Sequence, residues 1–279
     1  MYIYFAAHCC LYFMALWYET GNGPVRASLA RKENNCVAFL CGGGPSLNKI
    51  DPNFLNGHNR LVFALNNTYP RVKPDVWIGM DDPSCYRRDV FWQPFIKIMR
   101  GGYQRRLCEG QRIDHLHNMY YADVGELADP EEIFKLRAHD VRFVWAQNVF
   151  TTALHIIMWM GCKKIYLFGC DFHTSEGDYH DGGIILSDEN KDWNERLYEQ
   201  LYEYMNWFVS EAPNYGVEVY SCSPDSKINN FINYVNYKDV VTELEINLPE
   251  TKELLHSKDA AVREVARQKQ MKAGALKDV

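Results

Sequence analysis

The stretch CVAFLCGGGPSLNKID, residues 36–51, decides the fold of this chain. Its first six residues are apolar, and three glycines and a proline follow them directly. A short apolar run closed by chain-breaking residues is typical of a β-strand that is buried on both faces of a sheet. Since other elements must cover both faces of such a strand, the stretch predicts an α/β fold.

Further segments repeat this pattern of an apolar strand with a polar end. The expected strands are residues 60–65 (RLVFAL), 75–80 (DVWIGM), 164–169 (KIYLFG) and 217–222 (VEVYSC). The expected helices are residues 90–99, 149–160 (VFTTALHIIMWM) and 191–211, the last with large apolar side chains every three or four positions from Trp193 to Phe208. Strands that alternate with helices indicate a Rossmann-like, mainly parallel sheet with helices on both faces.

Length and composition favour one domain with extensions at both ends. The chain has 279 residues, of which 47% are hydrophobic and 24% are charged, as in ordinary folded domains. We expect the domain to span residues 36–237. An apolar segment and polar linker (1–35) would precede it, and a charged helical tail (238–279) would follow it. The apolar residues 1–17 are short for a membrane span and lack a basic start, so a docked segment is favoured over a signal anchor.

Charge and cysteine usage narrow the partners and the location. The net charge of −6 argues against nonspecific binding of nucleic acid. The nine cysteines form no C-x-x-C pair, and most lie in apolar runs, which favours reduced thiols over disulfides or zinc ligands. We therefore expect a cytoplasmic protein, with peripheral membrane association through residues 1–17 as the alternative.

Polar residues follow each expected strand at its carboxyl end. Since the carboxyl ends of parallel strands meet at one edge of a sheet, these residues are candidates for a shared ligand site. They are Gly42, Gly43, Gly44, Pro45, Ser46, Asn66, Asn67, Asp81, Asp82, Asp171 and residues 223–226.

Each of these candidates also has a structural alternative. The glycine turn lacks the third glycine of a dinucleotide fingerprint and the lysine of a P-loop, so it could be only a tight turn. Asn66 and Asn67 suit base or ribose edges, but asparagine pairs also form turns. Asp81 and Asp82 could hold a divalent ion, or they could cap a helix before Pro83.

The loop HTSEGDYHDGG, residues 173–183, holds the candidates for catalysis. His173, Tyr179 and His180 lie in it, and a histidine on a loop over a cleft is suited to act as a general base near neutral pH. The alternative for His180 is an exposed loop residue. His155, which lies within the apolar helix, is expected to be a core histidine.

Four segments together resemble a known family. VAFLCGGGPSLNKID, VFALNNTY, GCKKIYLFGCDFH and GVEVYSCSPDSKINNFI match in order and spacing the bacterial sialyltransferases that use CMP-sialic acid. They are also similar to the wider superfamily of MptE-like 6-hydroxymethylpterin diphosphokinases and motility-accessory glycosyltransferases. The match covers residues 36–235, with the G-P-S-L turn and the I-Y-L-x-G-x-D-F run as its most specific parts.

The resemblance implies roles for individual residues. It places the turn from Gly42 to Ser46 and the pair Asn66 and Asn67 on the nucleotide, together with Asp82 and Asn148. It places Asp171 on the ribose side and Tyr179 on the departing phosphate. Gly43, Asp82 and His173 differ from the residues that the sialyltransferases carry there, and their arginine has no counterpart in residues 145–148, which is a departure from the pattern for CMP-sialic acid. No histidine lies between residues 181 and 255, whereas the sialyltransferase base lies further downstream of the D-F motif. Several MptE-like relatives carry a histidine soon after that motif, which favours the wider superfamily.

The leading expectation is a sialyltransferase-like glycosyltransferase. It would use a nucleotide-sugar donor, a CMP-sugar as first candidate, and a glycan or other hydroxyl acceptor, with no cofactor. His180 would act as base, and the N–H groups of Gly42 to Gly44 would hold the nucleotide. One alternative is a diphosphokinase acting on a pterin-like alcohol, with Mg²⁺ held by Asp81, Asp82 and Asp171. Another is a nucleotide-binding module without catalysis.

Overall fold

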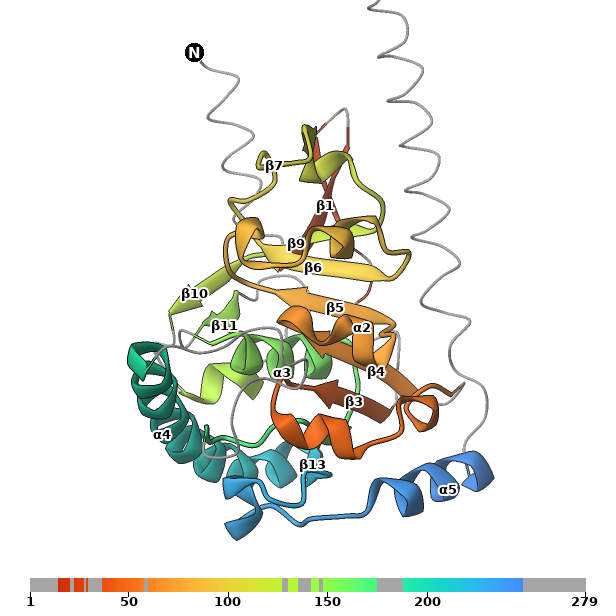
Figure 1. Cartoon of the computed structure of the whole chain (residues 1–279), viewed down its shortest axis with the longest axis vertical. Helices are drawn as coiled ribbons and strands as arrows, with labels where there is room; N and C mark the ends of the chain where they lie inside the picture. Colours follow the sequence, from red (N-terminus) through yellow and green to blue (C-terminus); the bar gives the residue numbers. More distant parts are fainter. Residues whose placement is uncertain are drawn as a thin grey trace, which may run out of the picture. The chain divides into compact units, whose positions relative to one another are not determined.

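The computed structural model describes residues 15–20, 23–27, 29, 37–57, 60–126, 130–134, 142–145, 148–174 and 188–247. Internal contacts divide the chain into two compact units, where the sequence led us to expect one domain over residues 36–237. Unit 1 consists of Met1–Glu33, Ile78–Met160 and Glu253–Val279, and unit 2 consists of Asn34–Trp77 and Gly161–Lys252. Figure 1 labels the elements of both units.

Parallel strands form the core of unit 2. Their order is β13 (Glu218–Ser221), β12 (Lys164–Phe168), β3 (Val37–Cys41) and β4 (Arg60–Leu65), and every neighbouring pair is parallel. Every side chain of β3 and β4 is buried, as expected for strands covered on both faces. These four strands and β5 (Val76–Gly79), which contains the boundary between the units, confirm the five strands expected from the sequence.

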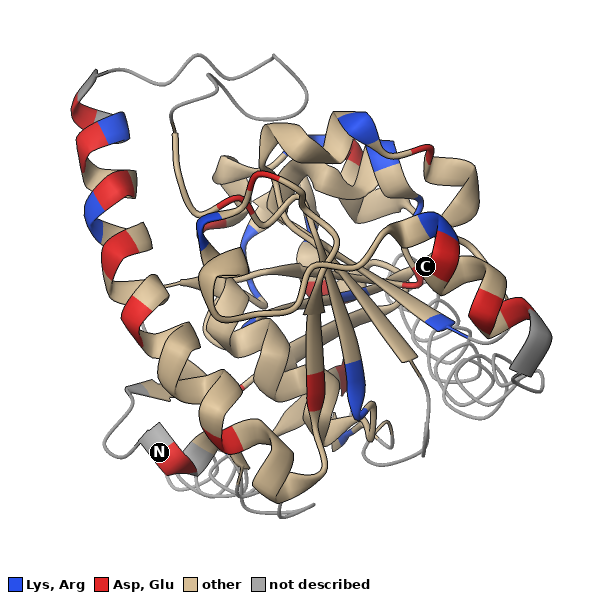
Figure 2. Ribbon diagram, turned by 90° about the horizontal axis from the view of Figure 1, so that it is seen from below, with Lys and Arg blue, Asp and Glu red and all other residues tan. Residues whose placement is uncertain are grey.

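Helices and short 3₁₀ turns complete unit 2. The expected helix over residues 191–211 is confirmed as α4 (Asp188–Glu211), whose exposed side carries a row of acidic residues (Figure 2). Leu201, Met205 and Phe208 are buried, but Trp193, which we expected on the same apolar stripe, is 53% exposed. That expectation was wrong because none of the described side chains of α4 before Leu201 is buried. The other elements are α2 (Tyr69–Val72), α5 (Tyr237–Asn247), η1 (Pro45–Lys49), η2 (Pro52–Phe54), η3 (Asn66–Thr68), η8 (Ala212–Tyr215) and η9 (Lys227–Asn230).

Helix α5 belongs to the core of unit 2, although the sequence suggested that a charged tail begins at residue 238. Val240, Val241 and Leu244 are buried. Glu245 lies 3.8 Å from the guanidinium of the buried Arg60, which also donates hydrogen bonds to the carbonyls of residues 54–56. Burying an apolar helix face contributes to stability, so the packed part of the chain extends past residue 238.

Unit 1 combines parallel and antiparallel pairs. Strand β6 (Ile96–Arg100) pairs in parallel with β9 (Met119–Ala122), which pairs antiparallel with β1 (Leu16–Thr20), and β1 forms a hairpin with β2 (Gly23–Arg26). Two small sheets hold β10 (Val124–Glu126) with β11 (Phe143–Trp145) and β7 (Leu107–Cys108) with β8 (Gln111–Arg112). The remaining elements are η4 (Pro83–Cys85), η5 (Arg88–Trp92), η6 (Ile113–His115), η7 (Pro130–Phe134) and α3 (Val149–Trp159).

Two expectations for unit 1 are corrected. The helix expected over residues 90–99 is a 3₁₀ turn that ends at Trp92 followed by strand β6. Pro94 cannot continue a helix, and the short apolar run after it was too brief to distinguish a helix from a buried strand. Strand β2 lies where we expected a polar linker, and strand β1 begins at the end of the expected apolar segment, where Trp17 is buried.

Helix α3 confirms the apolar helix expected over residues 149–160. Its side chains from Phe150 to Trp159 are buried, and Gly161 follows with a left-handed φ of 101°. His155 is a core histidine, as expected: its Nδ1 accepts the Val144 N–H at 3.1 Å, and burial lowers its pKa to about 3.

Thiols and membrane spans can be assessed for the described residues. None of the six cysteines among them forms a disulfide with another described residue: Cys41, Cys85, Cys108, Cys162, Cys170 and Cys222. No described helix combines the length and the apolar character that crossing a membrane requires.

We expect His155 to make the fold sensitive to mild acid. Its pKa is lower in the folded chain than its ordinary value of 6.5, so the unfolded state binds a proton that the native state does not. The contribution of neutral His155 to the free energy of unfolding is therefore complete above pH 6.5 and is lost as the pH falls from 6.5 towards 3. The loss is at most about 1.4 kcal/mol per pH unit. Urea denaturation at pH 7, 6 and 5 should show a weaker pH dependence for His155→Gln than for the unchanged chain.

The control is His115→Gln, because the His115 side chain is 58% exposed. It should keep the full pH dependence. If His155→Gln and His115→Gln lose stability in parallel between pH 7 and pH 5, His155 is not the acid-sensitive group.

Candidate functional site

Four loops of unit 2 follow the carboxyl ends of its strands and form what we call the unit 2 rim. They are residues 42–46 after β3, 66–68 after β4, 169–174 after β12 and 222–226 after β13. The Gly42 N–H donates to the Phe168 carbonyl at 2.7 Å, and the Cys170 N–H donates to the Ser223 hydroxyl at 3.2 Å. The Thr68 hydroxyl lies 3.4 Å from the Cys41 carbonyl. The expected convergence of loops is thus confirmed for these four.

Asp171 connects three of these loops. Its side chain is buried, with 3% exposed. One carboxylate oxygen accepts the Ser46 N–H at 2.9 Å, and the other accepts the Ser46 hydroxyl. Its backbone carbonyl accepts the Ser226 hydroxyl at 3.3 Å and the Lys227 N–H at 3.1 Å. A buried carboxylate needs such donors to offset its lost hydration, so these contacts fix the glycine turn against the ends of β12 and β13.

The turn requires glycine at positions 42 and 44 because a Cβ atom there would collide with neighbouring atoms. A Cβ atom on Gly44 would lie 2.4 Å from an Asp171 carboxylate oxygen, and one on Gly42 would lie 2.7 Å from the Gly169 carbonyl. Gly169 itself has a φ of 59°, which favours glycine. The Gly44 N–H donates to the Gly169 carbonyl at 2.8 Å. The N–H groups of Gly42 and Gly44, expected to hold a nucleotide, are therefore engaged within the protein.

Two buried amide oxygens, one in the rim and one in η9, which follows the rim loop 222–226, have no hydrogen-bond partner among the described residues. They are Oδ1 of Asn66 and Oδ1 of Asn229. Asn66 has a left-handed φ of 51°, which asparagine tolerates, and Asn67 follows it in the same turn. The Asn229 amide nitrogen donates to the carbonyls of Ser223 and Pro224, both at 2.9 Å. Leaving a buried acceptor unpaired costs about 1–3 kcal/mol, so a ligand hydroxyl or amino group is a favourable partner.

The loop after β12 leads towards the expected catalytic residues. Phe172 has a left-handed φ of 57°, a strained conformation for an aromatic residue. His173 Nε2 lies 3.1 Å from the Asp225 carbonyl, and the Asp225 carboxylate pairs with Lys49 at 2.5 Å. Tyr179 and His180 lie outside the described residues.

Thr174 fixes the end of this loop to α4. Its N–H and its hydroxyl both donate to one carboxylate oxygen of Glu195, at 2.6 and 2.5 Å. Burial raises the Glu195 pKa. The hydrogen bonds from Thr174 and the ion pair with Lys227 together lower this pKa by more than burial raises it, so the net shift is downward. Glu195 is therefore a charged anchor for the segment that precedes Tyr179.

The thiols near the rim are not nucleophiles. Cys41, Cys170 and Cys222 are buried, and burial raises the pKa of each of them. A thiol whose pKa lies far above neutral pH holds almost no thiolate, which is the reactive form. These three residues therefore serve packing.

The other predicted ligand residues lie in unit 1, where Asp82 and Asn148 act as helix caps. Asp82 accepts the N–H and the hydroxyl of Ser84 at 3.0 and 2.7 Å, which lowers its pKa. Asn148 caps α3 by accepting the Phe150 N–H at 2.7 Å. The Asp81 N–H donates to the Tyr86 hydroxyl at 2.7 Å, and burial raises the pKa of the Asp81 carboxyl. Within the described ranges, no group of three acidic, histidine or cysteine side chains could hold a metal ion.

Most residues of the rim were expected from the sequence, but Asn229 of η9 was not. This residue lies in the run GVEVYSCSPDSKINNFI, which carries part of the family resemblance. Its position in that run, seven residues after Cys222, was the available signal. Asparagine in a polar loop has many ordinary uses, so its type alone did not distinguish it.

Comparison with known proteins gives matches among solved structures. No family model and no curated protein matches the chain. The sialyltransferase CstII from Campylobacter jejuni in complex with cytidine-5′-monophosphate is 15% identical, with a TM-score of 0.43, covering 73% of this chain and 86% of that one. The same enzyme with CMP-3FNeuAc is 14% identical, with a TM-score of 0.42, covering 72% and 87%. A CST-II complex with a trisaccharide acceptor and CMP is 16% identical, with a TM-score of 0.40, covering 71% and 85%.

We expect Gly44→Ala to destabilise unit 2. The new methyl group would overlap the Asp171 carboxylate and force it away from Ser46, at a cost of about 1–3 kcal/mol. Gly125→Ala is the matched control, because a Cβ there would lie 3.5 Å from the Arg142 side chain, an ordinary contact. Urea denaturation measures both variants. Equal stability of the two would show that the glycine turn is not closely packed against Asp171.

Proposed function

We propose that this chain is a glycosyltransferase that binds an activated nucleotide sugar at the unit 2 rim and transfers the sugar to an acceptor hydroxyl. The observation that carries the proposal is the bond between Asp171 and Ser46, because it brings the two most specific motifs of the family resemblance together. A CMP-linked sugar is the first candidate donor, and a glycan is the first candidate acceptor.

The chemistry of the rim supports a nucleotide ligand. Open parallel sheets bind nucleotides at the carboxyl ends of their strands, and the rim lies at that end of β3, β4, β12 and β13. The unpartnered oxygens of Asn66 and Asn229 are acceptors, and a nucleoside offers matching donors in its ribose hydroxyls and in the amino group of cytosine. Asp171 positions the glycine turn in this proposal, since its carboxylate is bound to Ser46.

The transfer step uses the loop that begins at Thr174. In the proposed mechanism, His180 removes the proton of the acceptor hydroxyl, whose oxygen attacks the anomeric carbon of the sugar. The bond between the sugar and the phosphate breaks as the glycosidic bond forms, and Tyr179 donates a hydrogen bond to the departing phosphate. The anchor between Thr174 and Glu195 holds the start of this segment.

The magnesium-dependent alternative receives no comparable support. It would require Asp81, Asp82 and Asp171 to bind a metal ion. Asp171 is bound to Ser46, and Asp82 is bound to Ser84 and lies 3.3 Å from the Arg106 guanidinium. The carboxylates of Asp171 and Asp82 are thus engaged in contacts that stabilise the fold, and we propose the glycosyltransferase function only.

Two variants should separate donor binding from transfer. His180→Ala should lower the transfer rate by about 10²- to 10⁴-fold and leave CMP affinity unchanged, because a general base acts only in the chemical step. Asn66→Ala should weaken CMP binding by about tenfold, because it removes an acceptor. Calorimetry with CMP, UDP, GDP and ATP measures binding, and mass spectrometry of products from CMP-sialic acid and an oligosaccharide measures transfer.

Two exposed residues of the same types provide controls. His115→Ala and Asn214→Ala should change neither quantity. Transfer should persist in EDTA. Full turnover by His180→Ala would remove it as the base, and absence of binding by every nucleotide would contradict the proposed function. Diphosphate transfer that requires magnesium would favour the alternative.

A further inference from the structure

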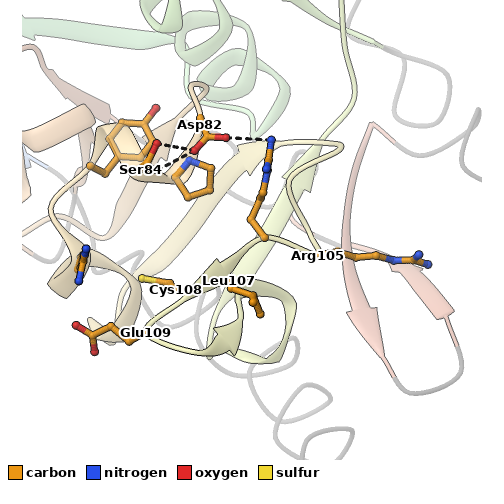
Figure 3. Close-up of a pocket in the computed structure, with 10 residues that line it drawn as sticks. Asp82, Ser84, Arg105, Leu107, Cys108 and Glu109 are labelled. Carbon is orange, nitrogen blue, oxygen red and sulfur yellow. Dashed lines mark hydrogen bonds and ion pairs between the residues drawn. The ribbon is translucent and has the colours of Figure 1, made fainter.

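Unit 1 contains a cavity of about 580 Å³ that the proposed mechanism does not use. One side is formed by residues 82–88, around η4, and the other by residues 105–109, which include strand β7 of the β7–β8 hairpin (Figure 3). Buried Tyr86 lines it, and Leu107, which is 66% exposed, lies at its edge. An exposed leucine that lines the cavity offers an apolar contact for part of a ligand.

The lining of this cavity is basic, although the chain as a whole carries a net charge of −6. Three arginines, Arg88, Arg105 and Arg106, line it together with two acidic residues, Asp82 and Glu109, which leaves one positive charge in excess. Guanidinium groups offer planar pairs of N–H donors that match the oxygens of carboxylates and phosphates. The cavity therefore favours an anion over a cation or a neutral ligand.

The arginines differ in their availability. Arg88 makes no ion pair with any residue in the described part of the chain. Arg106 lies 3.3 Å from an oxygen of Asp82, longer than the 2.7–2.9 Å typical of a strong charge-assisted bond. Figure 3 shows Arg105 extended away from Asp82. We therefore expect Arg105 to add positive charge to the cavity without bonding directly to the anion.

Asp82 does not depend on Arg106 for its place. Its other carboxylate oxygen accepts two hydrogen bonds from Ser84, which hold the turn at η4. Both members of the pair are partly exposed, and exposed ion pairs contribute little to stability, so Arg106 can exchange its partner at low cost.

We propose that this cavity binds an oxyanion, a phosphate or carboxylate group, between Arg88 and Arg106, and that the anion replaces Asp82 as the partner of Arg106. Asp82 is then a competitor for the site and not one of its ligands. This inference is independent of the proposed function, since it uses residues of unit 1 alone.

The test is calorimetric titration of the full chain with pyrophosphate and, separately, with succinate, at matched ionic strength. Each titration is run with and without saturating CMP. The CMP fills any nucleotide site, so anion binding that persists in its presence occurs elsewhere. Arg88→Gln and Arg106→Gln should each weaken binding by about tenfold or more. Asp82→Asn should strengthen binding, because it removes the competing charge. Arg196→Gln, an exposed arginine on α4, is the matched control and should bind as the unchanged chain does.

The outcomes separate clearly. Tighter binding of pyrophosphate identifies a phosphate ligand, tighter binding of succinate identifies a carboxylate ligand, and either supports the proposal if the arginine variants lose it. The proposal is overturned if neither anion binds. It is also overturned if Arg88→Gln and Arg106→Gln leave the affinity unchanged, if Asp82→Asn binds more weakly, or if anion binding is lost when CMP is present. A failure of CMP to bind would count against the proposed function and would leave this test intact.

Discussion

The arrangement of the unit 2 rim depends on the hydrogen bonds that the buried carboxylate of Asp171 accepts. This carboxylate accepts both donors of Ser46, and the backbone of the same residue accepts the Lys227 N–H. A carboxylate in a protein interior is stable only when donors offset its lost hydration. Residues 42–46, 169–174 and 223–227 are therefore held together by these bonds, which is the fixed geometry that the proposed glycosyltransferase site requires.

This arrangement assigns separate tasks to residues that sequence motifs group together. The glycines and Ser46 build the rim, since their N–H groups bond to residues 168–171. The ligand-facing candidates are instead side-chain acceptors, Asn66 and Asn229. The catalytic candidates Tyr179 and His180 follow Thr174, which Glu195 fixes to α4.

The parts that the sequence could predict are those with a strong local pattern. The apolar runs ended by breakers at Gly42, Asn66 and Asp171 define strands, because burial on both faces leaves no other solution. Strand β6 was not predictable because its run is short and follows Pro94. The role of the Gly42 and Gly44 N–H groups depends on residues 168–169, more than 120 positions away, and no local pattern encodes such a contact. The basic cavity of unit 1 likewise joins segments about twenty residues apart.

The most direct test of the central claim is a double-mutant cycle between Ser46→Ala and Asp171→Ala, measured by urea denaturation at neutral pH. If the carboxylate holds the glycine turn, the two changes are coupled, and the double variant loses less stability than the sum of the single variants by about 1–3 kcal/mol. Additive losses would contradict the account, because they would show that Asp171 and Ser46 stabilise the fold independently of each other.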